Sequence, residues 1–265
     1  MTEFKGKVAM ITGAGRGLGK HTAVAFARDG AQVVLTDVNE EWGLETLRLV
    51  REAGGEGVFL KSDASIERDV AHAVNTAVET YGRLDCALNN AGIELLSPVV
   101  DQTEEAWDHT FNVNAKSIMF CMKHQIPQML KSGGGAIVNQ TSVTSNITGM
   151  PGSSAYAASK AAVIGLSKSA AVEVAKDGIS INCIAAGCIL GDEPSLFSDF
   201  LKTTTLDHAT LKQYLPVGRF GEAEEFTSAV LFLCSKAARF ITGTTLVIDG
   251  GFTIGAVRLP KKPSA

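Results

Sequence analysis

The sequence predicts an α/β fold in a single domain, with a doubly wound parallel sheet of about seven strands and helices on both faces. Short runs rich in Val, Ile, Leu and Ala alternate with longer amphipathic segments, which is the pattern of parallel strands joined by crossover helices. Strands that are apolar on both faces need helices on both sides of the sheet. The chain has 265 residues, of which 45% are hydrophobic, and no Pro/Ser-rich linker divides it.

Seven short apolar segments are the expected strands, and they are spaced along the whole chain. They comprise residues 7–12, 32–37, 57–61, 85–89, 135–140, 180–184 and 245–248. The expected helices comprise residues 17–29, 40–53, 65–81, 103–131, 153–175 and 222–234. Since each of the first six expected strands is followed by an expected helix, the order of the elements itself favours parallel pairing.

In sheets of this kind, ligands bind beyond the carboxyl ends of the strands, so the loops that follow the strands are the expected site. The longest stretch without a clear element is residues 187–221. Long loops inside a compact domain usually serve binding, and we expect residues 188–215 to form a substrate-binding loop. Residues 256–265 are expected to be a flexible tail.

The charge pattern excludes several classes of function. The net charge is −4 and the pI is near 5.8, so the chain lacks the basic face that nucleic-acid binding requires. No apolar stretch reaches the roughly 18 residues of a membrane span, and the N-terminus is too polar for a signal peptide, so we expect a cytoplasmic protein without a membrane partner. Five cysteines without a CxxC pair indicate reduced thiols, and five histidines without ligand spacing predict no metal site.

A glycine-rich loop, Thr12-Gly13-Ala14-Gly15-Arg16-Gly17-Leu18-Gly19, follows the first strand and leads into the first helix. Without side chains, the backbone can turn tightly and approach a pyrophosphate at the helix N-terminus. A tight turn alone would explain such a cluster, but its place between a strand and a helix favours phosphate binding. The expected cofactor contacts in this loop are Gly13, Gly15, Arg16, Gly17, Leu18 and Gly19.

The type of nucleotide is predicted by Asp37, at the end of the second strand. Its carboxylate can accept hydrogen bonds from an adenosine ribose and would repel a phosphate in the same place. At ~4 Å and an effective dielectric constant of ~20, this repulsion is roughly 4 kcal/mol. Arg16 argues weakly for a 2′-phosphate, but no second basic residue follows Asp37. The sequence thus predicts NAD rather than NADP as the cofactor.

Tyr156 and Lys160 stand four residues apart in a segment without helix breakers, so a helix would place both on one face. Hydride transfer to a carbonyl carbon leaves an alkoxide that must be protonated, and the reverse reaction needs a base. A phenol with a pKa of about 10 is too weak a base at neutral pH. The Lys160 ammonium and an oxidised nicotinamide would both favour the phenolate, and lowering the pKa by ~2 units requires only ~2.7 kcal/mol.

The chain resembles the short-chain dehydrogenase/reductase family over nearly all of residues 6–255. Three motifs carry the resemblance: TGxxxGxG at residues 12–19, NNAG at residues 89–92 and YxxxK at residues 156–160. The resemblance implies a single Rossmann-like, NAD-binding domain over residues 1–265 and a homotetramer. The implied activity is that of an NAD-dependent alcohol dehydrogenase or ketone reductase, in which Tyr156 and Lys160 are catalytic and also contact the cofactor.

The resemblance implies that a serine hydrogen-bonds the substrate oxygen, and Ser142 is the residue we assign. It stands fourteen residues before Tyr156, one more than the commonest spacing in the family. Thr141, Thr144 and Ser145 therefore remain alternatives, each with a turn or capping role as its other interpretation.

The resemblance also implies a helix asparagine that holds a water molecule and links Lys160 to solvent. Asn114 is the matching residue, with Asn112 as the nearest alternative. Asp63 resembles the acidic residue that contacts the adenine ring, and either Asp63 or Ser65 could instead cap the next helix. The remaining implied cofactor contacts are Ala64, Asn90, Ala91, Gly92, Gly187 and Ile189.

Two positions depart from the pattern of the family. Ala186 stands where the family has a proline, and Gly191 replaces the threonine that meets the carboxamide of the nicotinamide. Backbone groups near Ile189 are the alternative anchor for this ring.

Two other functions fit parts of the pattern. An NAD-dependent epimerase or dehydratase shares YxxxK, but those chains carry a larger C-terminal region and a different glycine cradle. Enoyl reductases of the family separate the tyrosine and the lysine further. A non-catalytic NAD-binding sensor or scaffold would not need Asn114, Ser142, Tyr156 and Lys160 together. We therefore expect hydride transfer between NAD(H) and a small-molecule secondary alcohol or ketone.

Overall fold

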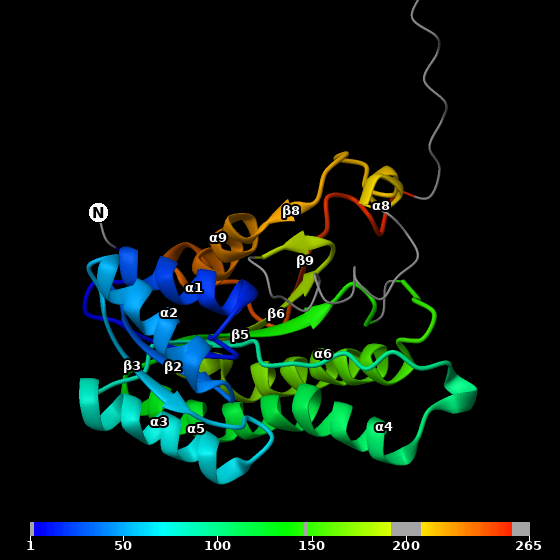
Figure 1. Ribbon diagram of the computed structural model, residues 1–265. Helices are drawn as coiled ribbons and strands as arrows, with labels where there is room; N and C mark the ends of the chain where they lie inside the picture. Colours follow the sequence, from blue (N-terminus) through cyan, green and yellow to red (C-terminus); the bar gives the residue numbers. More distant parts are fainter. Residues whose placement is uncertain (1–2, 146–147, 192–207, 256–265) are drawn as a thin grey trace, which may run out of the picture.

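A parallel sheet of seven strands forms the centre of the molecule (Figure 1). The computed structural model describes residues 3–145, 148–191 and 208–255. The strand order is β3-β2-β1-β4-β5-β6-β9, and all pairings are parallel. The strands are β1 (Val8–Thr12), β2 (Gln32–Asp37), β3 (Glu56–Lys61), β4 (Cys86–Asn89), β5 (Gly135–Ser142), β6 (Ile179–Ala186) and β9 (Thr245–Ile248).

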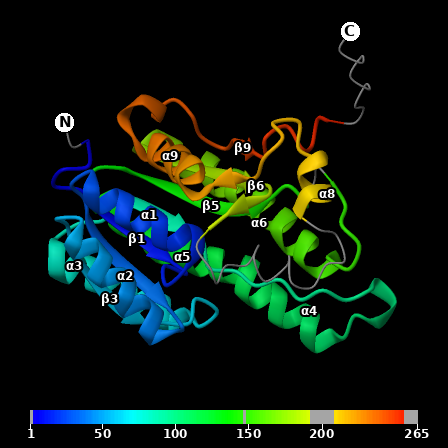
Figure 2. The same ribbon diagram turned by 45° about the horizontal axis from the view of Figure 1, so that its top comes forward.

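Helices cover both faces of this sheet, as Figures 1 and 2 show. One face carries α1 (Gly17–Arg28), α2 (Glu40–Glu52) and α9 (Ala223–Cys234). The other carries α3 (Glu67–Tyr81), α5 (Ser117–Lys131) and α6 (Ser154–Val174), with α4 (Glu104–Phe111) leading into α5. The predicted doubly wound α/β fold is therefore confirmed.

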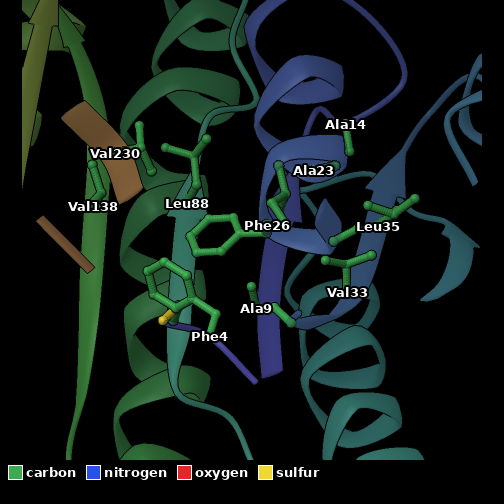
Figure 3. Packing of buried hydrophobic residues seen from close by; sticks show 14 of the residues in the cluster. Phe4, Ala9, Ala14, Ala23, Phe26, Val33, Leu35, Leu88, Val138 and Val230 are labelled. Atoms are coloured by element: carbon green, nitrogen blue, oxygen red, sulfur yellow. The ribbon is translucent and has the colours of Figure 1, made fainter. Parts of the chain in front are cut away.

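Each strand supplies side chains to two separate cores, which explains why its sequence is apolar throughout. In β1, Ala9 and Ile11 pack against the side of α1 and α9, whereas Val8 and Met10 pack against α3, α5 and α6. Figure 3 shows the first core, where Phe26 projects from α1 toward Leu88 on β4. Burying one such aromatic side chain contributes about 1.5–3 kcal/mol.

Most predicted boundaries agree with the structure within two residues, but the helix expected over residues 103–131 is interrupted. A π-helical turn, Asn112–Lys116, separates α4 from α5. The stretch 187–221 also contains elements that the sequence did not predict. They are β7 (Ile189–Leu190), α8 (His208–Gln213) and β8 (Gly221–Glu222), and β7 pairs with β8.

Part of the predicted substrate-binding loop, residues 192–207, and the predicted tail, residues 256–265, lie outside the described residues. No helix in the described ranges has both the length and the apolar character needed to cross a membrane. The strand order reverses between β1 and β4, and in open sheets this reversal opens a crevice at the carboxyl ends of the strands.

Candidate active site

A cleft of about 590 Å³ opens at the carboxyl ends of the strands. Most of the predicted site residues line it. They are Gly13, Arg16, Gly17, Leu18, Asp37, Asp63, Ala64, Asn90, Ala91, Gly92, Ser142, Tyr156, Lys160, Gly187 and Ile189. Gly15, Gly19 and Asn114 are not part of the lining, and their contacts show that they shape the cleft from behind it.

The glycine loop forms a cradle that side chains would fill. Gly13 and Gly17 have φ angles of +61° and +54°, in the left-handed region that favours glycine. A Cβ atom on Gly19 would lie 2.1 Å from the Gly13 carbonyl oxygen. At the start of α1, the side chain of the N-cap residue Arg16 makes no capping hydrogen bond. Free N–H groups at such a helix start suit a phosphate, so the loop fits a dinucleotide.

The NNAG segment fixes this loop to the next strand. The side-chain amide of Asn90 donates to the carbonyl oxygens of Thr12 (3.0 Å) and Gly13 (2.9 Å). In return, the Thr12 hydroxyl accepts hydrogen bonds from the backbone N–H groups of Asn90 (3.0 Å) and Ala91 (3.1 Å). The crevice between β1 and β4 is thus held at a fixed width.

Asp37 is held at the far end of the cleft by two backbone N–H groups. Gly15 donates to Oδ2 at 2.8 Å, and Asn39 donates to Oδ1 at 2.9 Å. The Arg16 guanidinium lies 5.0 Å from the centre of the Trp42 ring, within the range of a cation–π contact. These contacts place a carboxylate, rather than a cation, at the end of β2.

Asp63 lines the cleft and does not cap α3. Its Oδ1 accepts hydrogen bonds from the backbone N–H (2.8 Å) and the hydroxyl (2.7 Å) of Ser65, which closes a turn before the helix. The N-cap residue of α3 is Ile66, which makes no side-chain cap. The alternative that Asp63 or Ser65 caps this helix is therefore wrong.

Tyr156 and Lys160 lie on one face of α6, as their spacing predicts. The Lys160 Nζ atom is 5.8 Å from the centre of the Tyr156 ring and donates a hydrogen bond to the Gln140 carbonyl oxygen at 3.1 Å. Both side chains are buried, with 7% of Tyr156 and 2% of Lys160 exposed. They stand beside Ser142, at the carboxyl end of β5.

Burial shifts the pKa values of this pair in opposite directions. It lowers the pKa of Lys160 to about 8, although the Glu94 carboxylate acts to raise it. Burial raises the pKa of Tyr156 well above its ordinary value, and Glu94 adds to this effect. A hydrogen bond with Ser142 acts to lower the Tyr156 pKa. In the free protein the phenol therefore keeps its proton.

The hydroxyl groups of the residues near Ser142 hydrogen-bond to groups other than Tyr156. Thr141 donates to the Lys160 carbonyl oxygen at 2.8 Å, and Ser145 donates to the Ser142 carbonyl oxygen at 2.5 Å. The Thr144 hydroxyl donates to the Ser142 hydroxyl at 3.0 Å. Of the four candidates, Ser142 is the one whose hydroxyl acts on the pKa of Tyr156.

Asn114 lies fully buried in the π-helical turn, and its side-chain amide makes three hydrogen bonds. Its Oδ1 accepts from the Ile93 N–H at 2.8 Å, and its Nδ2 donates to the Ile93 carbonyl (2.9 Å) and the Ser159 hydroxyl (3.0 Å). A Cβ atom on Gly92 would lie 3.2 Å from both Asn114 Oδ1 and Lys160 Nζ. The structure thus brings Asn114 and Lys160 together on either side of this glycine.

The segment that departs from the family pattern is held by its backbone. Gly187 donates its N–H to the Ile248 carbonyl at 2.9 Å, and Gly221 donates to the Cys188 carbonyl at 3.0 Å. A Cβ atom on Gly187 would lie 2.7 Å from the Cβ of Asp249, so a glycine is needed for residue 187 to lie this close to Asp249. Strand pairing on both sides of residues 187–190 therefore fixes the loop without the usual proline.

Sequence reasoning missed several polar side chains of the cleft, among them Glu94 and Gln140. Glu94 follows the NNAG motif by two residues, and Gln140 precedes Ser142 by two. The available signal was their nearness to the recognised motifs, because Glu94 follows β4 and Gln140 lies near the end of β5, and the carboxyl ends of these two strands meet at the site.

Comparisons with known proteins agree with this geometry. A family model described as enoyl-(acyl carrier protein) reductase matches residues 13–253. Cyclohexanol dehydrogenase of Acinetobacter sp. strain SE19 is 38% identical over 255 residues, which cover 95% of this chain and 96% of that protein. The 3-oxoacyl-acyl-carrier-protein reductase FabG of Thermotoga maritima is 39% identical over 256 residues, covering 95% and 99%.

Solved structures give the same picture. The crystal structure of levodione reductase superposes with a TM-score of 0.90 at 33% identity, over 95% of this chain and 99% of that one. A short-chain type dehydrogenase/reductase from Mycobacterium marinum superposes with a TM-score of 0.87 at 30% identity, over 95% and 97%. The cleft, its motifs and these matches together identify the protein as an oxidoreductase of the short-chain dehydrogenase/reductase family.

Proposed function

We propose that this protein is an NAD-dependent dehydrogenase that transfers a hydride between NAD(H) and a secondary alcohol or its ketone. The observation that carries the proposal is the position of Tyr156, Lys160 and Ser142 at one end of the cleft that holds the glycine cradle and Asp37 at the other. Relatives named for cyclohexanol and cyclopentanol oxidation support the same class of substrate.

In this mechanism, the hydroxyls of Ser142 and Tyr156 bind the substrate oxygen. NAD supplies, when bound, a ring that accepts hydride from the carbinol carbon or returns it to the carbonyl carbon. Tyr156 takes the hydroxyl proton in oxidation and gives it back in reduction. The Lys160 ammonium favours the phenolate by its charge, and Asn114 steadies the backbone at Ile93 beside it.

The preference for NAD is inferred from Asp37, whose carboxylate is held by the N–H groups of Gly15 and Asn39 and would repel a 2′-phosphate bound beside it. In this role Asp63 and Ala64 border the adenine end, and Ile189 with Gly187 borders the nicotinamide end. Arg16, whose guanidinium lies over Trp42 in the same part of the cleft, acts in the opposite direction, because a cation attracts a phosphate.

We also infer a cytoplasmic homotetramer. Support for an assembly comes from large apolar side chains on the surface, among them Val100, Val172 and Phe240, which are exposed in the single chain. Support for the cytoplasm comes from free cysteines at all five positions.

The proposal is tested by following NADH absorbance with a panel of secondary alcohols. We expect Tyr156→Phe to lose more than ~100-fold in rate while it still binds NADH, because only the proton-transferring hydroxyl is removed. Tyr81→Phe, at the end of α3, is the matched control and should keep full activity. Near-normal turnover of Tyr156→Phe would refute the role of Tyr156. Faster reaction with NADP than with NAD would refute the role of Asp37.

A further inference from the structure

Glu94 is an acidic side chain in the wall of the cleft, beside the catalytic residues. It lines the cleft together with Tyr156 and Ser142, and apolar side chains such as Val143 and Met150 stand in the same wall. Its charge acts on Tyr156 and on Lys160, which places it within electrostatic reach of both. The mechanism above gives this carboxylate no part.

The carboxylate is held in place from the start of α6. The hydroxyl of Ser153, which is fully buried, donates to Glu94 Oε1 at 2.6 Å. The chain on either side is fixed as well, because Ser97 pairs with Ser153 in a bridge and its N–H donates to the Gly152 carbonyl at 2.8 Å. The first turn of α6 has no acidic residue of its own, so Glu94 supplies the negative charge that a helix start favours.

One oxygen of this carboxylate stays available for a ligand. Within the described part of the chain, Ser153 is the residue that donates a hydrogen bond to Glu94, and it uses Oε1. An ionised carboxylate can accept several hydrogen bonds with its two oxygens. Glu94 is only partly exposed, and burial raises its pKa, which shows that water solvates this group poorly. A hydroxyl group of a bound substrate can donate a hydrogen bond to the second oxygen of this carboxylate.

The same charge disfavours anionic substrates. Lys160 acts on the same region through space, but it is 2% exposed and donates to the Gln140 carbonyl oxygen, so a ligand would contact the Glu94 carboxylate more directly than the Lys160 ammonium. A carboxylate or phosphate on the substrate would therefore meet Glu94 in a partly desolvated cleft, where like charges repel strongly.

We propose that Glu94 is a specificity-determining residue, which hydrogen-bonds a second hydroxyl group of the substrate and excludes substrates that carry an anion near the reacting carbon. This inference rests on the proposed function and deepens it. The substrate class is then neutral diols, and the hydroxyketones formed from them, rather than hydroxy acids. Ser153 is a positioning residue for this carboxylate.

The test compares three probes with NAD: cyclohexanol, trans-1,2-cyclohexanediol and 3-hydroxycyclohexanecarboxylate. For the wild type, we expect kcat/KM for the diol to exceed that for cyclohexanol by at least ~10-fold, because a hydrogen bond to a charged group discriminates that strongly. Glu94→Leu should abolish this preference, so that the kcat/KM values for the diol and for cyclohexanol become about equal. Ser153→Ala should weaken the preference, since it frees the carboxylate without removing it.

Glu94→Gln separates the hydrogen bond from the charge and preserves the shape of the side chain. Its amide oxygen still accepts a hydrogen bond, so part of the diol preference should remain, while kcat/KM for the hydroxycarboxylate should rise at least ~10-fold. The matched control is Glu104→Gln, on the exposed first turn of α4, which should change none of the three rates. If Glu94→Leu does not fold, the kcat/KM of Glu94→Gln for the hydroxycarboxylate decides whether Glu94 determines specificity.

The outcomes distinguish the two proposals. Equal diol-to-cyclohexanol ratios in the wild type and Glu94→Leu, or an unchanged rate on the hydroxycarboxylate in Glu94→Gln, would overturn the role of Glu94 and leave alcohol oxidation intact. Failure of the wild type to oxidise any alcohol in the wider panel would overturn the proposed function and this inference together.

Discussion

At the scale of single residues, the free protein holds the proposed catalytic pair, Tyr156 and Lys160, in an environment that disfavours the charged form of each. Lys160 is 2% exposed and has a pKa of about 8, because burial disfavours its ammonium form. Tyr156 is buried as well, and its pKa lies above the ordinary value. A phenol that keeps its proton can serve ketone reduction directly, whereas alcohol oxidation needs the additional positive charge of the oxidised cofactor.

The Lys160 shift predicts how the stability of the free protein depends on pH. Its pKa in the folded state, about 8, lies below the ordinary 10.5, so between these values the unfolded chain binds more protons. The contribution of Lys160 to the free energy of unfolding therefore rises with pH across this window. Below pH 8, Lys160 is an ammonium in both the folded and the unfolded chain, so the full cost of burying this charge lowers the free energy of unfolding.

We expect Lys160→Met to abolish activity and to stabilise the free protein at pH 7 by about 2 kcal/mol, because it removes this cost. The gain should disappear as the pH approaches 10.5. Urea unfolding at pH 7 and pH 10 measures it, with Lys168→Met, an exposed position on the same helix, as the control. A variant that is less stable than the wild type at pH 7 would contradict the assigned cost.

Single residues also show what could be predicted from the sequence. The spacing of Tyr156 and Lys160 predicted that both lie on one face of a helix, and α6 places them so. Ser142 was also assigned from the sequence, with Thr141 as an alternative, and the structure adds that the Thr141 hydroxyl bonds to the Lys160 carbonyl. Glu94 was missed because a carboxylate after a strand is usually solvated, and nothing in the sequence indicates that Ser153 holds it in the cleft.

At the scale of elements, the π-helical turn at Asn112–Lys116 places Asn114 toward the site. The sequence predicts one helix across this region, since a periodic pattern does not reveal one extra residue in a turn. Such turns are frequent at functional sites. Here the turn brings the Asn114 amide onto both backbone groups of Ile93 and onto the Ser159 hydroxyl.

The glycine loop and α6 provide a matched pair of element-scale variants. Gly19→Ala would place a Cβ atom 2.1 Å from the Gly13 carbonyl, so the loop must move. We expect a loss of stability of about 1–3 kcal/mol and at least ~10-fold weaker NADH binding. NADH fluorescence titration and thermal unfolding measure the two effects.

The control is Gly165→Ala on α6, where no atom lies within 4 Å of the added Cβ. Replacing a glycine inside a helix should stabilise the protein by about 0.5–1 kcal/mol and leave NADH binding unchanged. Wild-type NADH affinity in Gly19→Ala would contradict the assignment of this loop as the phosphate cradle.

At the scale of the whole molecule, the sheet was predictable because each strand is apolar on both faces, and a parallel sheet with helices on both sides buries both. The small elements around the cleft were not. The pair β7 and β8 has two residues in each strand, and α8 has six, so neither shows a periodic pattern. Their position depends on long-range pairing between Ile189 and Gly221.

The central claim is that one cleft holds the dinucleotide between Asp37 and the Tyr156–Lys160 pair. The most direct test is a crystal structure of the protein with NAD bound. The account predicts that the adenosine ribose meets Asp37 and that Tyr156 and Lys160 face the nicotinamide end, with Ser142 beside them. A dinucleotide bound outside this cleft, or a nicotinamide ring from which both side chains point away, would contradict it.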